Sequence, residues 1–411
     1  MAKYILYGDG IHDDYPAIQE MINSGVCEVS LPAPKVFYLI SNTLVIPSNF
    51  KLKLPRFAEI RLADNANCLM LRNKSVEKPA KRLADDISEE ARFLWYYVDE
   101  LSPEPADACC NFEIEGGIWN CNNMNQLPNP LQSHQYDWDK KFIGHGMLFY
   151  NVRNFRLANM TFKDPTNYAV NIDRGSYFTI ENIDFDFNTG NPYAVNMDGI
   201  HLNGNCFHGY IRNLKGACYD DLVALNAHEG SRGDIANIDI DGIFAENCHS
   251  AVRLLTVTTM NRNVRIANVY GTYYQYCIGF TKYYPGVTTG KFDAIVLDNI
   301  SAAKSKRLPV QEMHLGDKSY VFPFIWLQKD THYGTLTING VHRREYAENV
   351  ETIYVGQDVI ADRLVVHDIT LENHTDKLCL KFANYGTVKE LRTDLATEEI
   401  VNKHEIGCIL H

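Results

Sequence analysis

Three carboxylates stand in two short motifs that lie close together in the chain. Asn196-Met197-Asp198-Gly199 is followed, after an interval that suits one coil of a β-helix, by the adjacent pair Asp220-Asp221. Carboxylates that approach one another without cations repel, so at least one pKa rises and a protonated acid can sit beside an ionised base. Hydrolysis of a glycosidic bond uses such an acid and base. We therefore take Asp198, Asp220 and Asp221 as candidate catalytic residues.

Short apolar runs containing Asn or Asp recur along the chain, and they must supply the scaffold. Their alternation of apolar and polar residues predicts β-strands of four to six residues, which lie within the runs 151–162, 177–185, 235–244, 263–270, 292–300, 334–341 and 364–371. Hairpin dipeptides are sparse, which disfavours an immunoglobulin-like sandwich. The pattern predicts an all-β protein, a right-handed single-stranded parallel β-helix that forms one domain over residues 1–411.

The N-terminal segment is expected to cap this solenoid. Asp13 or Asp14 can accept early N–H bonds of a helix, and Pro16 suits its first turn. A solenoid needs such a cap because its open end exposes apolar core and unpaired strand edge. Residues 1–30 are therefore predicted to form an N-terminal cap with a helix.

Two other segments interrupt the repeat. Residues 75–103 are rich in helix formers and predict a short helical insertion, whose Trp95, Tyr96 and Tyr97 either stack on sugars or pack the insertion onto the solenoid. Residues 122–141 lack periodicity and are expected to form a groove loop.

Composition narrows the class of partner. The 411 residues are 45% hydrophobic, with a formal net charge of -12 and no Lys/Arg-rich run, which argues against a nucleic-acid surface. The N-terminus lacks a signal-peptide pattern and no stretch reaches membrane-spanning length, so we expect a soluble, cytoplasmic protein without a membrane partner, or a secreted one if a signal has been removed. The eleven cysteines show no metal-ligand spacing and are expected to be reduced, buried thiols.

The motifs resemble those of glycoside hydrolase family 28, the polygalacturonase family of the pectin-lyase-like β-helix superfamily, in which this chain would be a divergent member. The resemblance spans most of the chain and rests on Asp9-Gly10-Ile11-His12-Asp13-Asp14 with Ala17-Ile18-Gln19, on Asn196-Met197-Asp198-Gly199 and on Asp220-Asp221. It implies that Asp220 is the general acid, that Asp198 and Asp221 hold and deprotonate the attacking water, and that the anomeric carbon is inverted.

The resemblance also implies substrate-binding positions, and here the chain departs from the family. Arg253 matches the arginine of an Arg-Ile-Lys motif, whereas Leu255 replaces its lysine, and Lys282 is a candidate replacement. The Gly-His-Gly motif expected between Asp221 and Arg253 is absent, so we expect the chain to lack the coil that contains it. The remaining candidates for binding the sugar are Asn196, His201, His228, His249 and Tyr284, with His228 or His249 supplying the missing imidazole.

These observations favour a metal-independent inverting glycoside hydrolase, without a cofactor, that acts on plant cell-wall oligosaccharides of pectin type containing uronic acid or rhamnose. Two alternatives stay open. One is a β-helix polysaccharide lyase or uronate epimerase, which would often use calcium. The other is a non-catalytic carbohydrate-binding or phage tail-type β-helix. Solenoids of this kind form monomers or trimers, and the sequence does not choose between them.

Overall fold

The computed structural model describes residues 5–74, 108–126, 145–187, 197–283, 288–307 and 321–411. The helical insertion expected at 75–103 lies outside these ranges. Of the groove loop expected at 122–141, only residues 122–126 are described, and they contain the 3-10 helix η1 (Asn123–Asn125). Within the described ranges, no helix is both long enough and apolar enough to span a membrane.

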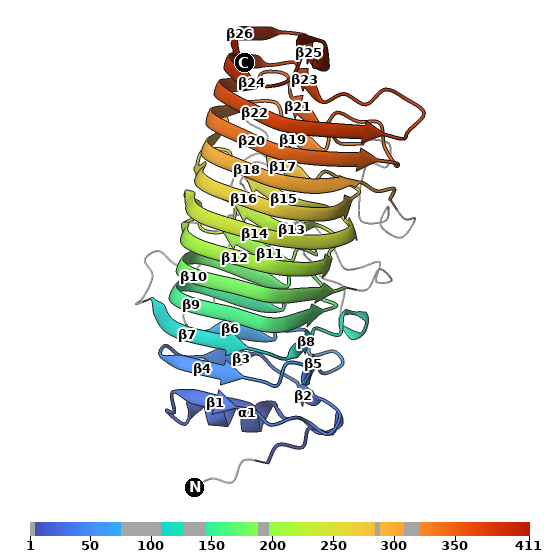
Figure 1. Cartoon of the computed structure of the whole chain (residues 1–411). Coiled ribbons are helices and arrows are strands. Elements are labelled where there is room, and N and C mark those ends of the chain that lie inside the picture. Colours follow the sequence, from blue (N-terminus) through green and yellow to red (C-terminus); the bar gives the residue numbers. More distant parts are fainter. Residues whose placement is uncertain (1–4, 75–107, 127–144, 188–196, 284–287, 308–320) are drawn as a thin grey trace, which may run out of the picture.

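Parallel strands stack coil upon coil, and the two termini lie at opposite ends of the stack (Figure 1). The first column of strands contains most of the longest ones, and it consists of β1 (Glu28–Ser30), β4 (Phe50–Lys53), β7 (Cys109–Glu115), β9 (Met147–Lys163), β10 (Val170–Asp186), β12 (Cys206–Ala217), β14 (Ile235–Cys248), β16 (Met260–Tyr273), β18 (Gly290–Lys304), β20 (Thr331–Glu345), β22 (Ile360–Asn373), β24 (Thr387–Thr393) and β26 (Glu405–Leu410).

A second column contains short strands, joined through β9 and β10: β3 (Leu44–Ile46), β6 (Leu71–Asn73), β11 (Ile200–Asn203), β13 (Asp221–Asn226), β15 (Ser250–Leu255), β17 (Ile278–Thr281), β19 (Ile325–Leu327), β21 (Ile353–Val355), β23 (Phe382–Asn384) and β25 (Ile400–Asn402). A third column near the N-terminus contains β2 (Tyr38–Ile40), β5 (Glu59–Leu62) and β8 (Ile118–Asn120). A second 3-10 helix, η2 (Thr397–Glu399), precedes β25. The predicted parallel β-helix is confirmed.

Most strands of the first column are longer than the four to six residues expected from the sequence, and corner asparagines explain the difference. Asn159, Asn182 and Asn213 have φ of 58°, 57° and 54° inside β9, β10 and β12. Asparagine tolerates this left-handed conformation better than most residues. The side chains also bond across coils, Asn182 Nδ2 to Asn159 Oδ1 at 2.9 Å and Asn213 Nδ2 to Asn182 Oδ1 at 3.1 Å. The chain therefore bends while pairing continues through the corner.

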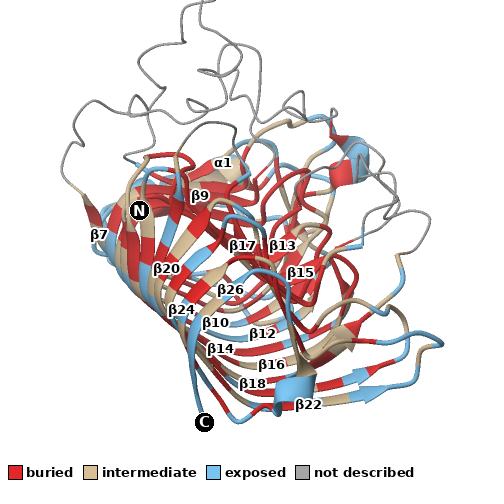
Figure 2. Ribbon diagram, turned by 90° about the horizontal axis from the view of Figure 1, so that it is seen from above, coloured by how far each residue is buried: buried red, intermediate tan, exposed pale blue. Residues whose placement is uncertain are grey.

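The interior of the solenoid is apolar. Strand register aligns one buried aliphatic residue per coil in a continuous row, which runs through Ile114, Leu157, Ile180, Ile211, Ile240, Ile266, Leu297, Ile338 and Val366. Figure 2 shows the buried residues of β13, β15 and β17 along the wall of the second column. Because the row adds apolar burial at every coil, each coil is stabilised by its neighbours.

The expected N-terminal helix is present as α1 (Tyr15–Asn23). Asp13 Oδ1 accepts the N–H of Tyr15 at 3.0 Å, whereas Asp14 accepts N–H groups outside the helix, from Tyr7 at 2.7 Å among others. Ile18 is buried against the first coils, and α1 packs on β1 and β3. Asp13 therefore accepts an early N–H bond of the helix, as expected, and Asp14 holds the segment that precedes it.

Candidate active site

The candidate catalytic carboxylates lie where three successive coils of the second column meet. β11, β13 and β15 are neighbours, with His201 beside Ala224 and Ala224 beside Arg253. Asp198 precedes β11, and the N–H of Gly199 donates to the backbone oxygen of Asp221 at 3.0 Å. Because β13 pairs directly with β15, no coil separates Asp221 from Arg253. The stack therefore has no coil between β13 and β15, where the Gly-His-Gly motif was expected.

Asp198 and Asp221 are fully buried, and their oxygens are held by the protein. Asp198 Oδ1 accepts the N–H of Asp221 at 3.1 Å. Asp221 Oδ1 accepts the hydroxyl of Tyr276 at 3.0 Å and that of Ser250. Among the described residues, no donor N–H or O–H is aligned on Asp221 Oδ2. This oxygen is therefore the acceptor of the pair that keeps an unused lone pair.

Asp220 differs from its two neighbours because its side chain is 20% exposed. Burial, followed by the charges of Asp198 and Asp221, raises the pKa of Asp220 well above the usual range of a carboxyl. Burial also raises the pKa of Asp198, to about 6, although the hydrogen bond from His201 opposes the rise. The site therefore places Asp220, whose pKa is raised by burial and by two neighbouring carboxylates, beside Asp198, whose pKa is about 6.

His201 points into the site. Its Nδ1 lies 2.5 Å from Asp198 Oδ2, and its Nε2 lies 3.0 Å from Glu229 Oε2. The second contact is electrostatic, because the Nε2–H is not aligned on the oxygen. Tyr168 stacks on the ring, with centroids 4.0 Å apart. Burial opposes the charge of the imidazolium, yet the two carboxylates raise the pKa of His201 to about 9.

Arg253 supplies the second positive charge. Its Nε lies 3.0 Å from Asp221 Oδ2, but the N–H is directed to Asn226 Oδ1, at 3.5 Å, so the contact with Asp221 is also electrostatic. Although burial opposes the charge, Asp221 and neighbouring acids raise the pKa of Arg253. The ring of Tyr283 lies 5.6 Å from the guanidinium carbon, within cation–π range. Arg253 therefore favours the ionised forms of Asp198 and Asp220.

The structure distinguishes the two histidines that were candidates for the missing imidazole. His249 Nδ1 lies 3.6 Å from Asp220 Oδ1 and 4.0 Å from Asp221 Oδ1. His228 Nδ1 instead lies 3.4 Å from the hydroxyl of Thr258. Burial lowers the pKa of His249 to about 3, so the ring is neutral at physiological pH. His249 is the candidate that reaches the acids.

The described residues contain one group whose spacing suits a metal ion. Donor atoms of Asp220, Asp221 and His249 all lie within 4.8 Å of one another. Two carboxylates and an imidazole are ligands that zinc and similar divalent cations accept. The sequence analysis expected no metal, and this geometry keeps a cation among the chemistries that the site can hold.

Three other residues were predicted to bind the substrate: Asn196, Lys282 and Tyr284. Asn196 and Tyr284 lie outside the described residues. The backbone N–H of Lys282 donates to Gln328 Oε1 at 2.6 Å, and the side chain is largely buried. Its role toward a substrate therefore stays a prediction.

Sequence reasoning missed Glu229, Tyr168 and Ser250. Glu229 lies in the turn that follows β13. An acidic residue directly after a strand that contains candidate site residues was therefore the signal that the sequence offered. Ser250 pairs in register with Asp221 on the next coil, which only the pairing reveals. Tyr168 precedes β10 and gave no signal of its own.

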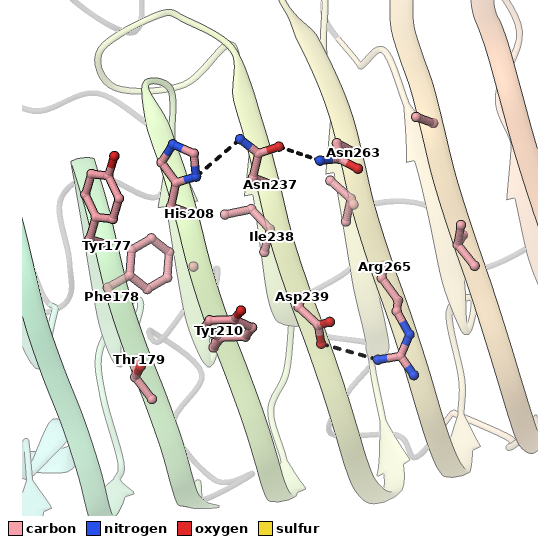
Figure 3. A pocket seen from close by; sticks show the side chains of 14 residues that line it. Tyr177, Phe178, Thr179, His208, Tyr210, Asn237, Ile238, Asp239, Asn263 and Arg265 are labelled. Carbon is pink, nitrogen blue, oxygen red and sulfur yellow. Dashed lines mark hydrogen bonds and ion pairs between the residues drawn. The ribbon is translucent and has the colours of Figure 1, made fainter.

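A separate surface groove of about 560 Å³ runs along the first column (Figure 3). Exposed Tyr177 and Tyr210 line it, with Asp239 and Arg265, which form an ion pair at 3.3 Å. Its lining includes none of the predicted site residues. The groove and the acid cluster therefore lie at different places on the solenoid.

The stacked coils define a parallel β-helix protein, and part of the chain matches the model of a known family. Residues 106–266 match the family model described as glycosyl hydrolases family 28, which supports the resemblance of the motifs. The matched segment contains Asp198, Asp220, Asp221 and Arg253 but ends before Lys282. No curated protein matches the chain in sequence.

Solved structures share the fold at low identity. The Yersinia enterocolitica family 28 exopolygalacturonase has a TM-score of 0.53 at 13% identity, over 99% of this chain and 76% of that one. The Streptococcus pneumoniae surface adhesin PfbA has a TM-score of 0.50 at 13% identity, over 99% and 91%. The N-terminal fragment of bacteriophage phi29 gene product 12 has a TM-score of 0.53 at 12% identity, over 98% and 65%. At these identities the likeness shows the fold alone.

Proposed function

We propose that this protein is an inverting glycoside hydrolase that acts on pectin-type plant cell-wall oligosaccharides containing uronic acid or rhamnose. The observation that carries the proposal is the contrast among the three acids. His201 and Arg253 lie against Asp198 and Asp221, whereas Asp220 has a raised pKa and is partly exposed. One protonated acid beside two charge-stabilised carboxylates is the arrangement that acid–base hydrolysis of a glycoside requires.

In this mechanism Asp220 donates its proton to the departing glycosidic oxygen. Asp221 Oδ2, which has no aligned donor, accepts a proton from the attacking water, and Asp198 helps to hold that water. Water attacks the face of the sugar opposite to the departing group, so the configuration at the anomeric carbon inverts. Tyr276 and Ser250 donate to Asp221 Oδ1 and fix the orientation of the carboxylate.

The substrate class rests on the family match and on local cations. Arg253 lies at the edge of the acid cluster with a side chain 16% exposed, so it can meet a sugar carboxylate or hydroxyl. Lys282 is proposed as a second cation in place of the lysine that Leu255 replaces. We also propose a cytoplasmic location, where oligosaccharides rather than polymers would be the substrates.

One observation favours an alternative reaction. The metal-like spacing of Asp220, Asp221 and His249 suits a lyase that neutralises a sugar carboxylate with a bound cation. Incubation with a panel of pectic oligosaccharides, with EDTA or with added calcium, separates the two chemistries. Saturated products formed in EDTA support hydrolysis. Unsaturated products, which absorb in the ultraviolet, formed only when calcium is added would contradict hydrolysis.

A further inference from the structure

Glu229 lies behind His201, on the side away from Asp198, and completes a row of acid, imidazole and acid. Both ring nitrogens of His201 face a carboxylate oxygen, Nδ1 at 2.5 Å from Asp198 and Nε2 at 3.0 Å from Glu229. A neutral imidazole carries one N–H and would direct a lone pair at one of these anions. An anion beside each nitrogen therefore favours the imidazolium, which carries a proton on both.

The turn after β13 fixes Glu229 in this place. Asn226 Nδ2 donates to Glu229 Oε2 at 2.7 Å, and the N–H of Gly204 donates to the backbone oxygen of Glu229 at 3.1 Å. The next residue, Gly230, has φ of +59°, and a Cβ there would lie 2.1 Å from Asp173 Oδ2. The backbone is thus held from both sides, and the carboxylate cannot swing away from the ring without breaking these contacts.

Other charged groups around His201 do not replace Glu229. His145 stacks on the far face of Tyr168, and burial keeps its pKa well below the usual range, so it is neutral. Arg253, from β15, lies 3.9 Å from Glu229 Oε1. Glu229 therefore contacts both cations of the site, whereas Asp198 contacts His201 and Asp221 contacts Arg253.

We propose that Glu229 is a positioning residue that keeps His201 doubly protonated, so that the imidazolium in turn holds Asp198 ionised and correctly oriented. The proposal rests on the proposed function for its catalytic consequence. Without the charge of Glu229, His201 loses its second proton at a lower pH, and Asp198 then faces a neutral ring. Asp198 then has no cation beside it, and the carboxylate is less well oriented to hold the attacking water.

The test is Glu229→Gln, which keeps the size and the acceptor oxygen of the side chain but removes its charge. We expect the alkaline limb of the kcat/KM profile to move down by about one to three pH units, the range for loss of one neighbouring charge. The matched control is Glu181→Gln, which removes a carboxylate paired with Arg156 at 2.8 Å on the sheet surface. The control should leave the profile unchanged.

A second readout does not depend on turnover. The ¹⁵N shifts of His201, followed against pH in the full chain, should show both nitrogens protonated at neutral pH in the unaltered protein and one deprotonated in Glu229→Gln. Equal titration of His201 in both proteins would overturn the proposal even if the enzyme is active. If no substrate is hydrolysed but the shifts differ as expected, the proposed function fails and the role of Glu229 stands.

Discussion

Asp220→Asn isolates the general acid, because the amide has nearly the same shape but no proton to give. Asp220 is the partly exposed member of the three acids, and its pKa is raised by burial and by Asp198 and Asp221. Loss of general-acid assistance costs about 10²–10⁴-fold in rate. That corresponds to about 2.7–5.4 kcal/mol in the activation free energy. The variant should fold normally, since it removes a group whose ionisation would add repulsion.

The assay compares two substrates with the same sugar. A natural oligosaccharide has a poor leaving group and needs the proton, whereas an aryl glycoside leaves more easily, so kcat should fall much less on the aryl substrate. Asp184→Asn, which removes a surface carboxylate paired with Arg56 at 2.7 Å, is the control and should keep full activity. Equal losses on both substrates, or full activity of Asp220→Asn on the oligosaccharide, would refute the assignment.

The remaining predictions concern charge, substrate and backbone. The pKa of His201 is about 9 in the folded protein, above its ordinary value of about 6.5. The stability that protonated His201 contributes is therefore complete below about pH 6.5 and is lost as the pH rises through 9. Urea unfolding at several pH values should show this decline, and His201→Gln should abolish it. Lys282→Ala should raise KM for a uronate oligosaccharide more than for a neutral one, and equal effects would remove Lys282 from the substrate site. Gly230→Ala should destabilise the fold by more than the roughly 1–2 kcal/mol that a left-handed backbone costs a residue with a Cβ, because the new Cβ clashes with Asp173. Gly25→Ala, where φ is +84° and no atom lies within 4 Å of the new Cβ, should cost only that backbone energy. Equal urea midpoints for the two variants would contradict the clash.

Much of the scaffold and of the acid cluster was predictable from the sequence, because both depend on spacing along successive coils. Asp198, Asp220 and Asp221 meet since one coil separates their motifs, and Arg253 joins them because no further coil intervenes. Strand lengths were underestimated. The sequence pattern ends a strand at each corner asparagine, such as Asn182, whereas the pairing continues through the left-handed residue.

The parts that could not be predicted depend on side-chain direction in turns. His228 and His249 were equivalent as isolated histidines, and only the fold shows that His249 follows β14 and reaches Asp220. Glu229 was missed because the positive φ of Gly230 and the contacts of its turn decide where the preceding carboxylate points. Such directions follow from three-dimensional contacts that no local pattern records.

The most direct test of the central claim is the anomeric configuration of the first product. Proton NMR of a pectic oligosaccharide during hydrolysis in EDTA, recorded before mutarotation equilibrates the released sugar, reads that configuration at its reducing end. The proposed acid and base predict an initial product of inverted configuration from the unaltered protein, formed at a rate reduced about 10²–10⁴-fold in Asp220→Asn. Retained configuration, or hydrolysis that stops when EDTA is added, would contradict the account.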